Sequence, residues 1–437
     1  MKRIQISKKI PDKEGFKKKA IQWAQGFDPV IVLESNHFSQ KKDQAFKEFD
    51  CLIALGSERD LIGKKGLAFS GLKKFIDEQA DYYFGYFSYD LKNEIEDLNS
   101  NNPDQLGFPD LYFFQAKKIL IWKNNEVQFH YPEYLSHEVD QDIEQIKEVE
   151  TSVLHIEYSD TQIKAQMSKE DYLKKADNIM NHIQRGDIYE VNFCQEFYQS
   201  PSTIDPLQVY HNLNRRSEAP FSSFLKTQGK FLMGASPERF VKKNGTSIVA
   251  QPIKGTAKRH SEPVLDHEIA TLLSEDEKER AENIMIVDLI RNDLSKISTQ
   301  GSVQVRELCE VYTFKQVHQL ISTISCEADP NVHPVDIIKN LFPMGSMTGA
   351  PKISAMKIIE EEEVSKRGLY SGSIGYFSPN QDFDFNVVIR SILYNQNRKY
   401  ASMMVGSAIT SQSDINKEYE ECLLKARALK EALMGQL

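Results

Sequence analysis

The dipeptide Asn244-Gly245, between two runs of strand-forming residues, constrains the fold of this chain more than any other feature. Asn-Gly favours a type I′ turn, because both central residues of that turn need a positive φ. The turn predicts a β-hairpin in which the strand that ends near Val241 folds back onto residues 247–254. Such a hairpin brings Glu238 and Lys254 into one neighbourhood, an acid and an amine on the same ribbon.

The strand register decides whether these two side chains share a face. In an unbroken hairpin with a two-residue turn, Glu238 lies opposite Gln251, which places Lys254 on the other face of the ribbon. Pro252 cannot donate a hydrogen bond to the ladder, so we expect a bulge or a break there. Such a break turns Lys254 back toward Glu238.

Lys254 is a candidate nucleophile because it stands at a strand end between rigid Pro252 and flexible Gly255. An amine attacks carbon only when it is neutral, so we expect the pocket to lower the pKa of Lys254 through burial or nearby positive charge. Considered alone, a lysine at a strand end is more often a surface charge. The carboxylates later in the chain favour the interpretation of Lys254 as a nucleophile over that of a surface charge.

A helix that we expect to start at the capping box Ser274-Glu275-Asp276-Glu277 carries Glu282 in line with an apolar stripe. Near the C-terminus, Glu418, Glu421 and Lys425 recur at i, i+3 and i+7 on one helix face. Two carboxylates one turn apart can share a hard cation with Glu282, and oxygen ligands without His or Cys indicate Mg²⁺ rather than zinc. The alternative is a solvated helix face with i, i+4 ion pairs.

Composition excludes several classes of protein. The 437 residues carry a net charge of -9 without a basic stripe, so we expect no nucleic-acid partner. No segment is apolar enough to span a membrane and the N-terminus lacks the apolar core of a secretion signal, so we expect a cytoplasmic protein. The five cysteines are scattered without C-x-x-C spacing, which indicates reduced thiols.

The chain divides into three regions by pattern. Residues 1–132 combine apolar strands and helices, 133–166 form a polar, acidic linker, and 167–437 form the catalytic region. The third region opens on a helix that we expect to be capped by Ser168 and closed by Gly186.

Six motifs of the third region occur in the order typical of one enzyme family. They are Ser236-Pro237-Glu238-Arg239-Phe240, Pro252-Ile253-Lys254-Gly255-Thr256, Ala281-Glu282-Asn283, Gly349-Ala350-Pro351-Lys352, Gly372-Ser373-Ile374-Gly375-Tyr376 and Glu418-Tyr419-Glu420-Glu421. On these motifs the chain resembles the chorismate-utilising enzymes, and within that family it is similar to component I of aminodeoxychorismate synthase, close to component I of anthranilate synthase. The N-terminal region fits more loosely.

The resemblance implies an α+β fold in which two antiparallel β-sheets pack as a sandwich with helices on the outside. It also implies a function: conversion of chorismate and ammonia to 4-amino-4-deoxychorismate, toward 4-aminobenzoate and folate. Because the chain shows no Cys-His-Glu glutaminase module, we expect ammonia from a separate glutamine amidotransferase subunit. The alternatives are anthranilate synthase component I and a non-catalytic, tryptophan-binding regulatory subunit.

The resemblance further implies roles for single residues. Lys254 adds to the ring as a covalent nucleophile, and Glu238 protonates the departing C4 hydroxyl, which needs a raised carboxyl pKa. The implied Mg²⁺ ligands are Glu282, Glu421 and Glu418. The implied substrate-binding residues are Tyr376, Arg390, Gly406, Ser407, Lys425, Ser346 and Gln319, and the candidate tryptophan segment is Leu33, Glu34 and Ser35.

Three positions depart from the family pattern. Members that add water carry a lysine where this chain has Glu190, and members that use ammonia usually carry glutamine there. Glu190 either contacts the incoming ammonia or pairs with a neighbouring basic residue. Gln319 stands where anthranilate synthases have a catalytic histidine, and His318 is one residue away, on the opposite face of a strand. Ser407 is one of the small residues that replace glycines of the carboxylate loop, which preserves the backbone N–H groups.

Overall fold

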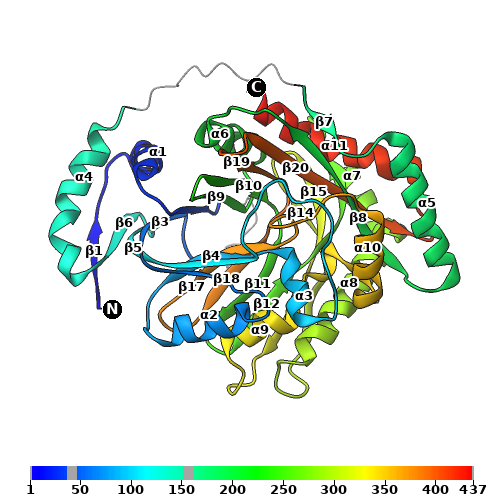
Figure 1. Cartoon of the computed structure of the whole chain (residues 1–437), viewed down its shortest axis with the longest axis horizontal. Helices are drawn as coiled ribbons and strands as arrows, with labels where there is room; N and C mark the ends of the chain where they lie inside the picture. The colour runs from blue at the N-terminus through cyan, green and yellow to red at the C-terminus, as the bar shows by residue number, and fades with distance from the viewer. Residues whose placement is uncertain (1, 37–46, 151–161, 436–437) are drawn as a thin grey trace.

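The computed structural model describes residues 2–36, 47–150 and 162–435 (Figure 1). Every strand pair within these residues is antiparallel, and the strands form two layers that join at the long strand β5 (Leu111–Lys123). The first layer runs, neighbour by neighbour, through β7 (Lys164–Ala165), β8 (Glu190–Gln199), β20 (Tyr400–Thr410), β19 (Ser391–Asn395), β10 (Lys230–Ser236), β9 (Phe221–Thr227), β2 (Val30–Glu34), β3 (Cys51–Ile62), β5, β6 (Glu126–Pro132) and β1 (Arg3–Lys8).

The second layer starts from β5 and returns across the first. It runs through β4 (Tyr83–Phe87), β17 (Ser373–Phe377), β18 (Phe383–Val387), β11 (Arg239–Asn244), β12 (Ser247–Gln251) and β15 (Val317–Glu327), with β13 (Ile253–Lys258) and β14 (Gln304–Thr313) also paired to β15 and the short β16 (Gly349–Ala350) paired to β8. The sandwich of two antiparallel sheets is therefore confirmed.

Helices lie outside the two layers (Figure 1). They are α1 (Lys13–Trp23), η1 (Ala24–Gly26), α2 (Ala68–Asp77), η3 (Tyr89–Leu91), α3 (Lys92–Ile95), η4 (Glu133–Glu138), α4 (Val139–Glu148), α5 (Lys169–Arg185), α6 (Pro206–Ser217), α7 (Pro263–Glu275), α8 (Glu277–Ser295), α9 (Pro334–Leu341), η5 (Gly345–Met347), α10 (Lys352–Glu362) and α11 (Ile415–Leu433).

Alternation along the strands divides the apolar side chains between two cores. On β10, Leu232 joins Val241 and Phe385 in the core between the layers, whereas its neighbours Phe231 and Met233 point to the opposite face. That face packs against helices α5, α6 and α11. The period-two pattern of strands is sufficient to explain this division.

The predicted hairpin is confirmed, but its turn lies one residue later than expected. Asn244 pairs with Ser247, so Gly245 and Thr246 are the central residues, and of these two Gly245 alone takes a positive φ, 60°. The expected type I′ turn of Asn244 and Gly245 is therefore wrong, because that turn needs a positive φ at both central residues. The later turn and a bulge in β11 together place Arg239, not Glu238, opposite Gln251. The strand breaks at Pro252 and resumes as β13, as expected. Glu238 lies in the turn that precedes β11, because Pro237 interrupts the strand.

Two helix starts were predicted with different success. Ser168 caps α5 by accepting from the backbone N–H of Asp171, and Gly186 closes it with a φ of 82°. The helix start at the box 274–277 was predicted two residues too early: Asp276, not Ser274, caps α8, and Ser274 belongs to the preceding α7. The corner at Asp276 separates the two helices.

The three predicted regions are not separate bodies in space. Strand β2 of the first region pairs with β9, and β4 pairs with β17, so N-terminal strands complete both layers. Residues 133–148 of the predicted linker form η4 and α4, because Val139, Ile143 and Ile146 recur at helical spacing and are buried. Residues 151–161 of that linker lie outside the described residues. No helix in the described part of the chain is long and apolar enough to cross a membrane.

Candidate active site

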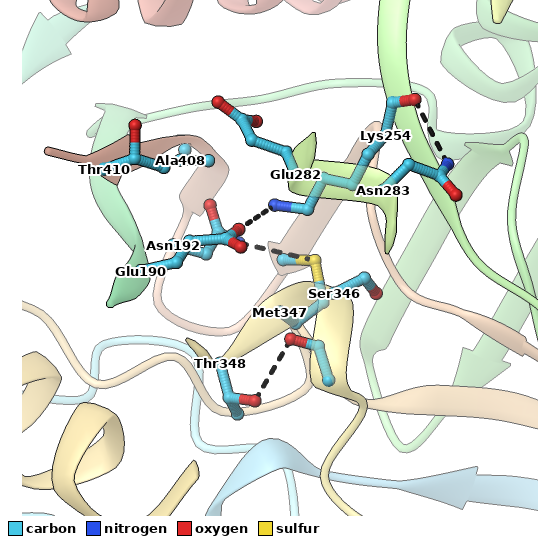
Figure 2. Close-up of polar contacts among 12 residues, drawn as sticks. Glu190, Asn192, Lys254, Glu282, Asn283, Ser346, Met347, Thr348, Ala408 and Thr410 are labelled. Carbon is cyan, nitrogen blue, oxygen red and sulfur yellow. Dashed lines mark hydrogen bonds and ion pairs between the residues drawn. The ribbon is translucent and has the colours of Figure 1, made fainter. Parts of the chain in front are cut away.

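A cavity of about 190 Å³ lies where the hairpin, α8, β20 and α11 meet. Most of the predicted site residues line it: Glu238, Lys254, Glu282, Gln319, Ser346, Arg390, Gly406, Glu418, Glu421 and Lys425. Figure 2 shows Lys254 and Glu282 reaching into the same space from different elements. Residues nearly 190 positions apart in sequence therefore surround one small volume.

Lys254 reaches the cavity because the β13 ladder is irregular around it. The pairing of β13 with β15 shifts between Ile253 and Thr256, and Gly255 takes a φ of 91°, which glycine adopts without strain. The Lys254 carbonyl accepts a hydrogen bond from the Asn283 side chain at 3.4 Å (Figure 2). This local bulge sets the direction of the side chain.

The ammonium of Lys254 pairs with Glu190. The two atoms Nζ and Oε1 are 2.5 Å apart, and both side chains are largely buried (Figure 2). Burial lowers the pKa of Lys254, but the charges of Glu190, Glu282 and Glu238 outweigh it, and the net pKa is raised. The expectation of a lowered pKa was therefore wrong, because the sequence did not reveal how many carboxylates face this amine.

Glu238 has the property that an acid role requires. Its carboxyl is buried, and the Ser346 hydroxyl donates to Oε1 at 2.5 Å. Burial raises the pKa of Glu238 to about 7, against the smaller opposing effects of the Ser346 hydrogen bond and the Lys254 charge. The side chain is thus close to half-protonated at neutral pH.

A cluster of carboxylates occupies another side of the cavity. Glu282 of α8 and Glu418 of α11 both approach Lys278, whose Nζ lies 3.8 Å and 3.3 Å from them. Glu421 pairs with Lys425 at 2.5 Å, and Lys425 also donates to the Gly406 carbonyl at 2.8 Å.

These carboxylates fit part of the coordination shell of a hard cation. Oε1 of Glu282 is buried without a hydrogen-bond partner among the described residues, and burial raises the pKa of this carboxyl to about 7. A bound cation would relieve both features. Within the same residues, no group of three His, Cys, Asp or Glu side chains is arranged to enclose an ion alone. Further ligands would have to come from substrate or water.

Arg390 lies beside the cavity between β18 and β19, with a φ of 50°. No ion pair with its guanidinium occurs in the described ranges, and burial lowers its pKa. A half-buried cation that lines a cavity without an ion-pair partner favours an anionic ligand. Tyr370 lines the same cavity.

One predicted contact is wrong in this structure, and one predicted residue turns its side chain away from the cavity. Tyr376 points into the core between the layers, where its hydroxyl donates to Glu48 at 3.0 Å; the tyrosine beside Arg390 is instead Tyr370. Ser407 faces away from the cavity, and its hydroxyl contacts Tyr172 of α5 at 3.2 Å. Strand parity explains the orientation of Ser407, because Gly406 and Ser407 are neighbours on β20 and point to opposite faces. Substrate binding through the backbone N–H of Ser407 stays a prediction.

Gln319 and His318 divide as strand parity predicts. Gln319 lines the cavity and donates to Thr256 Oγ1 at 3.4 Å, with its own carbonyl oxygen unpartnered among the described residues. His318 contacts Asp266 at 3.0 Å on the other face of β15. The histidine therefore does not replace the glutamine at this site.

The segment Leu33, Glu34 and Ser35 lies outside this cavity. Leu33 packs in the core between the layers, and Glu34 is held by Tyr210 at 2.5 Å, Asn214 at 3.0 Å and Lys17 at 3.2 Å. Ser35 lines a separate, smaller cavity of about 40 Å³. Tryptophan binding at this segment stays a prediction.

Sequence reasoning missed several residues of the cavity wall, among them Lys278, Asn192 and Tyr370. Lys278 lies four positions before Glu282, so helical spacing alone could have placed it on the same face. Asn192 lies two positions after Glu190 on β8, and its amide reaches Met347 Sδ at 3.5 Å (Figure 2). Tyr370 precedes β17 in a turn, where no periodic pattern marks it.

An amine, a carboxyl with a pKa of about 7 and a carboxylate cluster around one cavity define an enzyme site. The chain belongs to the family of chorismate binding enzymes, whose family model matches residues 16–431.

Relatives within that family include aminodeoxychorismate synthase component 1 of Bacillus subtilis (strain 168), 32% identical over 428 residues, which cover 93% of this chain and 88% of the relative. The probable chloroplastic aminodeoxychorismate synthase of Oryza sativa subsp. japonica is 33% identical over 383 residues, or 79% of this chain. The chain spans less than half the length of this plant relative, 42%. The crystal structure of anthranilate synthase component I from Streptococcus pneumoniae TIGR4 is similar with a TM-score of 0.78 at 25% identity, covering 86% of this chain and 91% of that one.

Proposed function

We propose that this chain converts chorismate and ammonia to 4-amino-4-deoxychorismate. The observation that carries the proposal is the position of Lys254, whose Nζ faces a cavity that Glu238 also lines. Relatives named aminodeoxychorismate synthase component 1 support it, since one of them aligns over 93% of the chain.

Chorismate carries two carboxylates on a small ring, and the cavity offers two places for anions. Arg390, with Tyr370 beside it, binds the enolpyruvyl carboxylate. Glu282, Glu418 and Glu421 would hold Mg²⁺, which when bound supplies positive charge for the ring carboxylate. Lys425 stands next to this position.

The two side chains at the hairpin act on the ring between these anchors. Lys254 adds through Nζ to C2 while Glu238 gives its proton to the C4 hydroxyl, which leaves as water. Ammonia then adds at C4, the ring double bond returns, and Lys254 departs from C2. Glu238 recovers a proton from the new amino group, and the enolpyruvyl group stays on the product.

The ammonia would come from a glutamine amidotransferase partner, and the product would serve the formation of 4-aminobenzoate and folate. The component 1 names of the bacterial relatives support a partner chain. Free ammonium salts at high pH should replace that partner in vitro.

Product analysis tests the proposal. Purified protein with chorismate, Mg²⁺ and ammonium should yield 4-amino-4-deoxychorismate by mass spectrometry. Formation of anthranilate and pyruvate would instead establish the anthranilate synthase alternative. The similarity to the pneumococcal anthranilate synthase structure is the observation that favours this alternative. Chorismate left unconsumed, with ammonium and Mg²⁺ varied, would favour the regulatory alternative.

A further inference from the structure

Glu190 occupies an unusual position behind the proposed nucleophile. It starts β8, is 1% exposed, and does not itself line the cavity. Its Oε1 accepts from Lys254 Nζ at 2.5 Å (Figure 2). Its Oε2 is buried without a hydrogen-bond partner among the described residues. Lys254 is thus the single side chain to which this carboxylate is hydrogen-bonded in that part of the chain.

This geometry places a proton acceptor in direct hydrogen-bond contact with the Lys254 ammonium. A proton on the short Nζ to Oε1 contact needs to move only a fraction of an ångström to convert ammonium and carboxylate into amine and carboxylic acid. The net charge of the pair is the same before and after that transfer.

We propose that Glu190 is the internal proton acceptor of Lys254, holding the lysine proton for as long as Nζ is bonded to the substrate ring. The inference rests on the proposed function and assigns Glu190 a positioning role, because it acts through Lys254 and does not touch the substrate cavity. It also explains how a lysine surrounded by carboxylates becomes nucleophilic without losing a proton to solvent.

The protons balance over the cycle. Glu190 takes one proton from the Lys254 ammonium, and the neutral amine forms the C–N bond as Glu238 protonates the leaving hydroxyl. The adduct nitrogen keeps two hydrogens, so Lys254 leaves as a neutral amine when ammonia adds at C4. Glu238 then takes a proton from the product ammonium, and Glu190 returns its own to Lys254.

The test is the pH dependence of adduct formation in Glu190→Gln, an isosteric change that removes the acceptor. Adduct formation without ammonia is followed by intact-mass spectrometry after a rapid quench. In the wild type, deprotonation of the lysine should not make the rate fall at low pH, because the lysine proton stays within the pair. The Glu190→Gln lysine must lose its proton to solvent, so its rate should rise about tenfold per pH unit below the lysine pKa. Titration of Glu238 is common to both proteins and cancels in the ratio of their rates.

Other charges also face Lys254 and stay in place in both proteins: Glu238 before β11, Glu279 and Glu282 on α8, and Glu421 on α11. Glu190→Asp keeps a carboxylate and should keep the wild-type profile at a lower rate. Glu196→Gln is the matched control on the same strand, since Glu196 accepts from Tyr400 and Ser402 and not from Lys254. It should leave the profile unchanged.

Reductive methylation of Lys254 by formaldehyde with a borohydride reductant, followed by peptide mass mapping, separates the failure of the proposed function from the failure of the role of Glu190. It needs the same neutral amine but no chorismate chemistry. If wild-type protein forms no chorismate adduct at any pH while methylation still differs between wild type and Glu190→Gln, the proposed function fails and the role of Glu190 stands. Superimposable pH profiles for wild type and Glu190→Gln with both reagents would overturn the role of Glu190.

Discussion

Replacing Glu238 by glutamine should abolish most activity and stabilise the fold. The carboxyl pKa is raised from 4.5 to about 7 by burial, so ionising Glu238 in the folded protein is costly. At about 1.4 kcal/mol per pKa unit, this corresponds to about 3 kcal/mol. Glutamine keeps the size and can accept from Ser346 but never ionises.

The sign follows from proton linkage. Below the unfolded-state pKa, the Glu238 carboxyl is protonated in both the folded and the unfolded protein, and its burial then has no ionisation cost. Between 4.5 and about 7 the unfolded chain ionises while the folded chain holds its proton, so wild-type stability falls as pH rises. Above about 7 the cost is complete, and there Glu238→Gln should gain up to about 3 kcal/mol in the free energy of unfolding.

Denaturant unfolding of both proteins near pH 4 and pH 8 measures this difference, and the same preparations give the activity. We expect a stability gain at the higher pH alone, together with a loss in kcat of about 10²-fold to 10⁴-fold. Equal free energies of unfolding for wild type and Glu238→Gln at both pH values would contradict the claim that the buried Glu238 carboxyl stays neutral in the folded protein. Full activity in the variant would refute its role as an acid.

Three further outcomes follow from the same site. Ser346→Ala removes a hydrogen bond that lowers the pKa of Glu238, so the alkaline limb of the pH profile of kcat should move to higher pH. An unchanged position of that limb would show that it does not report the ionisation of Glu238. Arg390→Gln should raise KM for chorismate by about 10-fold to 100-fold, the size of the loss of one charged hydrogen bond, and should raise thermal stability by removing a half-buried cation that has no ion-pair partner among the described residues. An unchanged KM would show that the enolpyruvyl carboxylate binds elsewhere. Tyr370→Phe should raise KM while Tyr376→Phe leaves it unchanged, and the reverse order would restore the contact predicted from sequence.

Local chemistry in the sequence predicted the local structure well. The hairpin itself, the strand break at Pro252 and the caps of α5 all depend on residues within a few positions of one another. The helix carboxylates were also placed correctly toward the cavity, because helical spacing and a resemblance in six motifs pointed the same way.

Contacts between distant segments were beyond this reasoning. Glu190 and Lys254 are 64 positions apart, and no pattern in either strand showed that their side chains would meet. The later turn of the hairpin and the bulge in β11 together shifted the register by one residue, and the choice between two tyrosines near β17 depended on which end of the strand lies at the cavity. Such features depend on how strands cross in space, which period-two alternation does not specify.

The central claim is that Lys254 is a covalent nucleophile, and one mass measurement tests it most directly. Wild-type protein mixed with chorismate and Mg²⁺ in the absence of ammonia, then quenched and digested, should carry chorismate minus one water on the peptide that contains Lys254. The adduct should be absent from Lys254→Ala. Product formation from chorismate and ammonium at the wild-type rate by Lys254→Ala, with no adduct on any lysine of the wild type, would contradict the account.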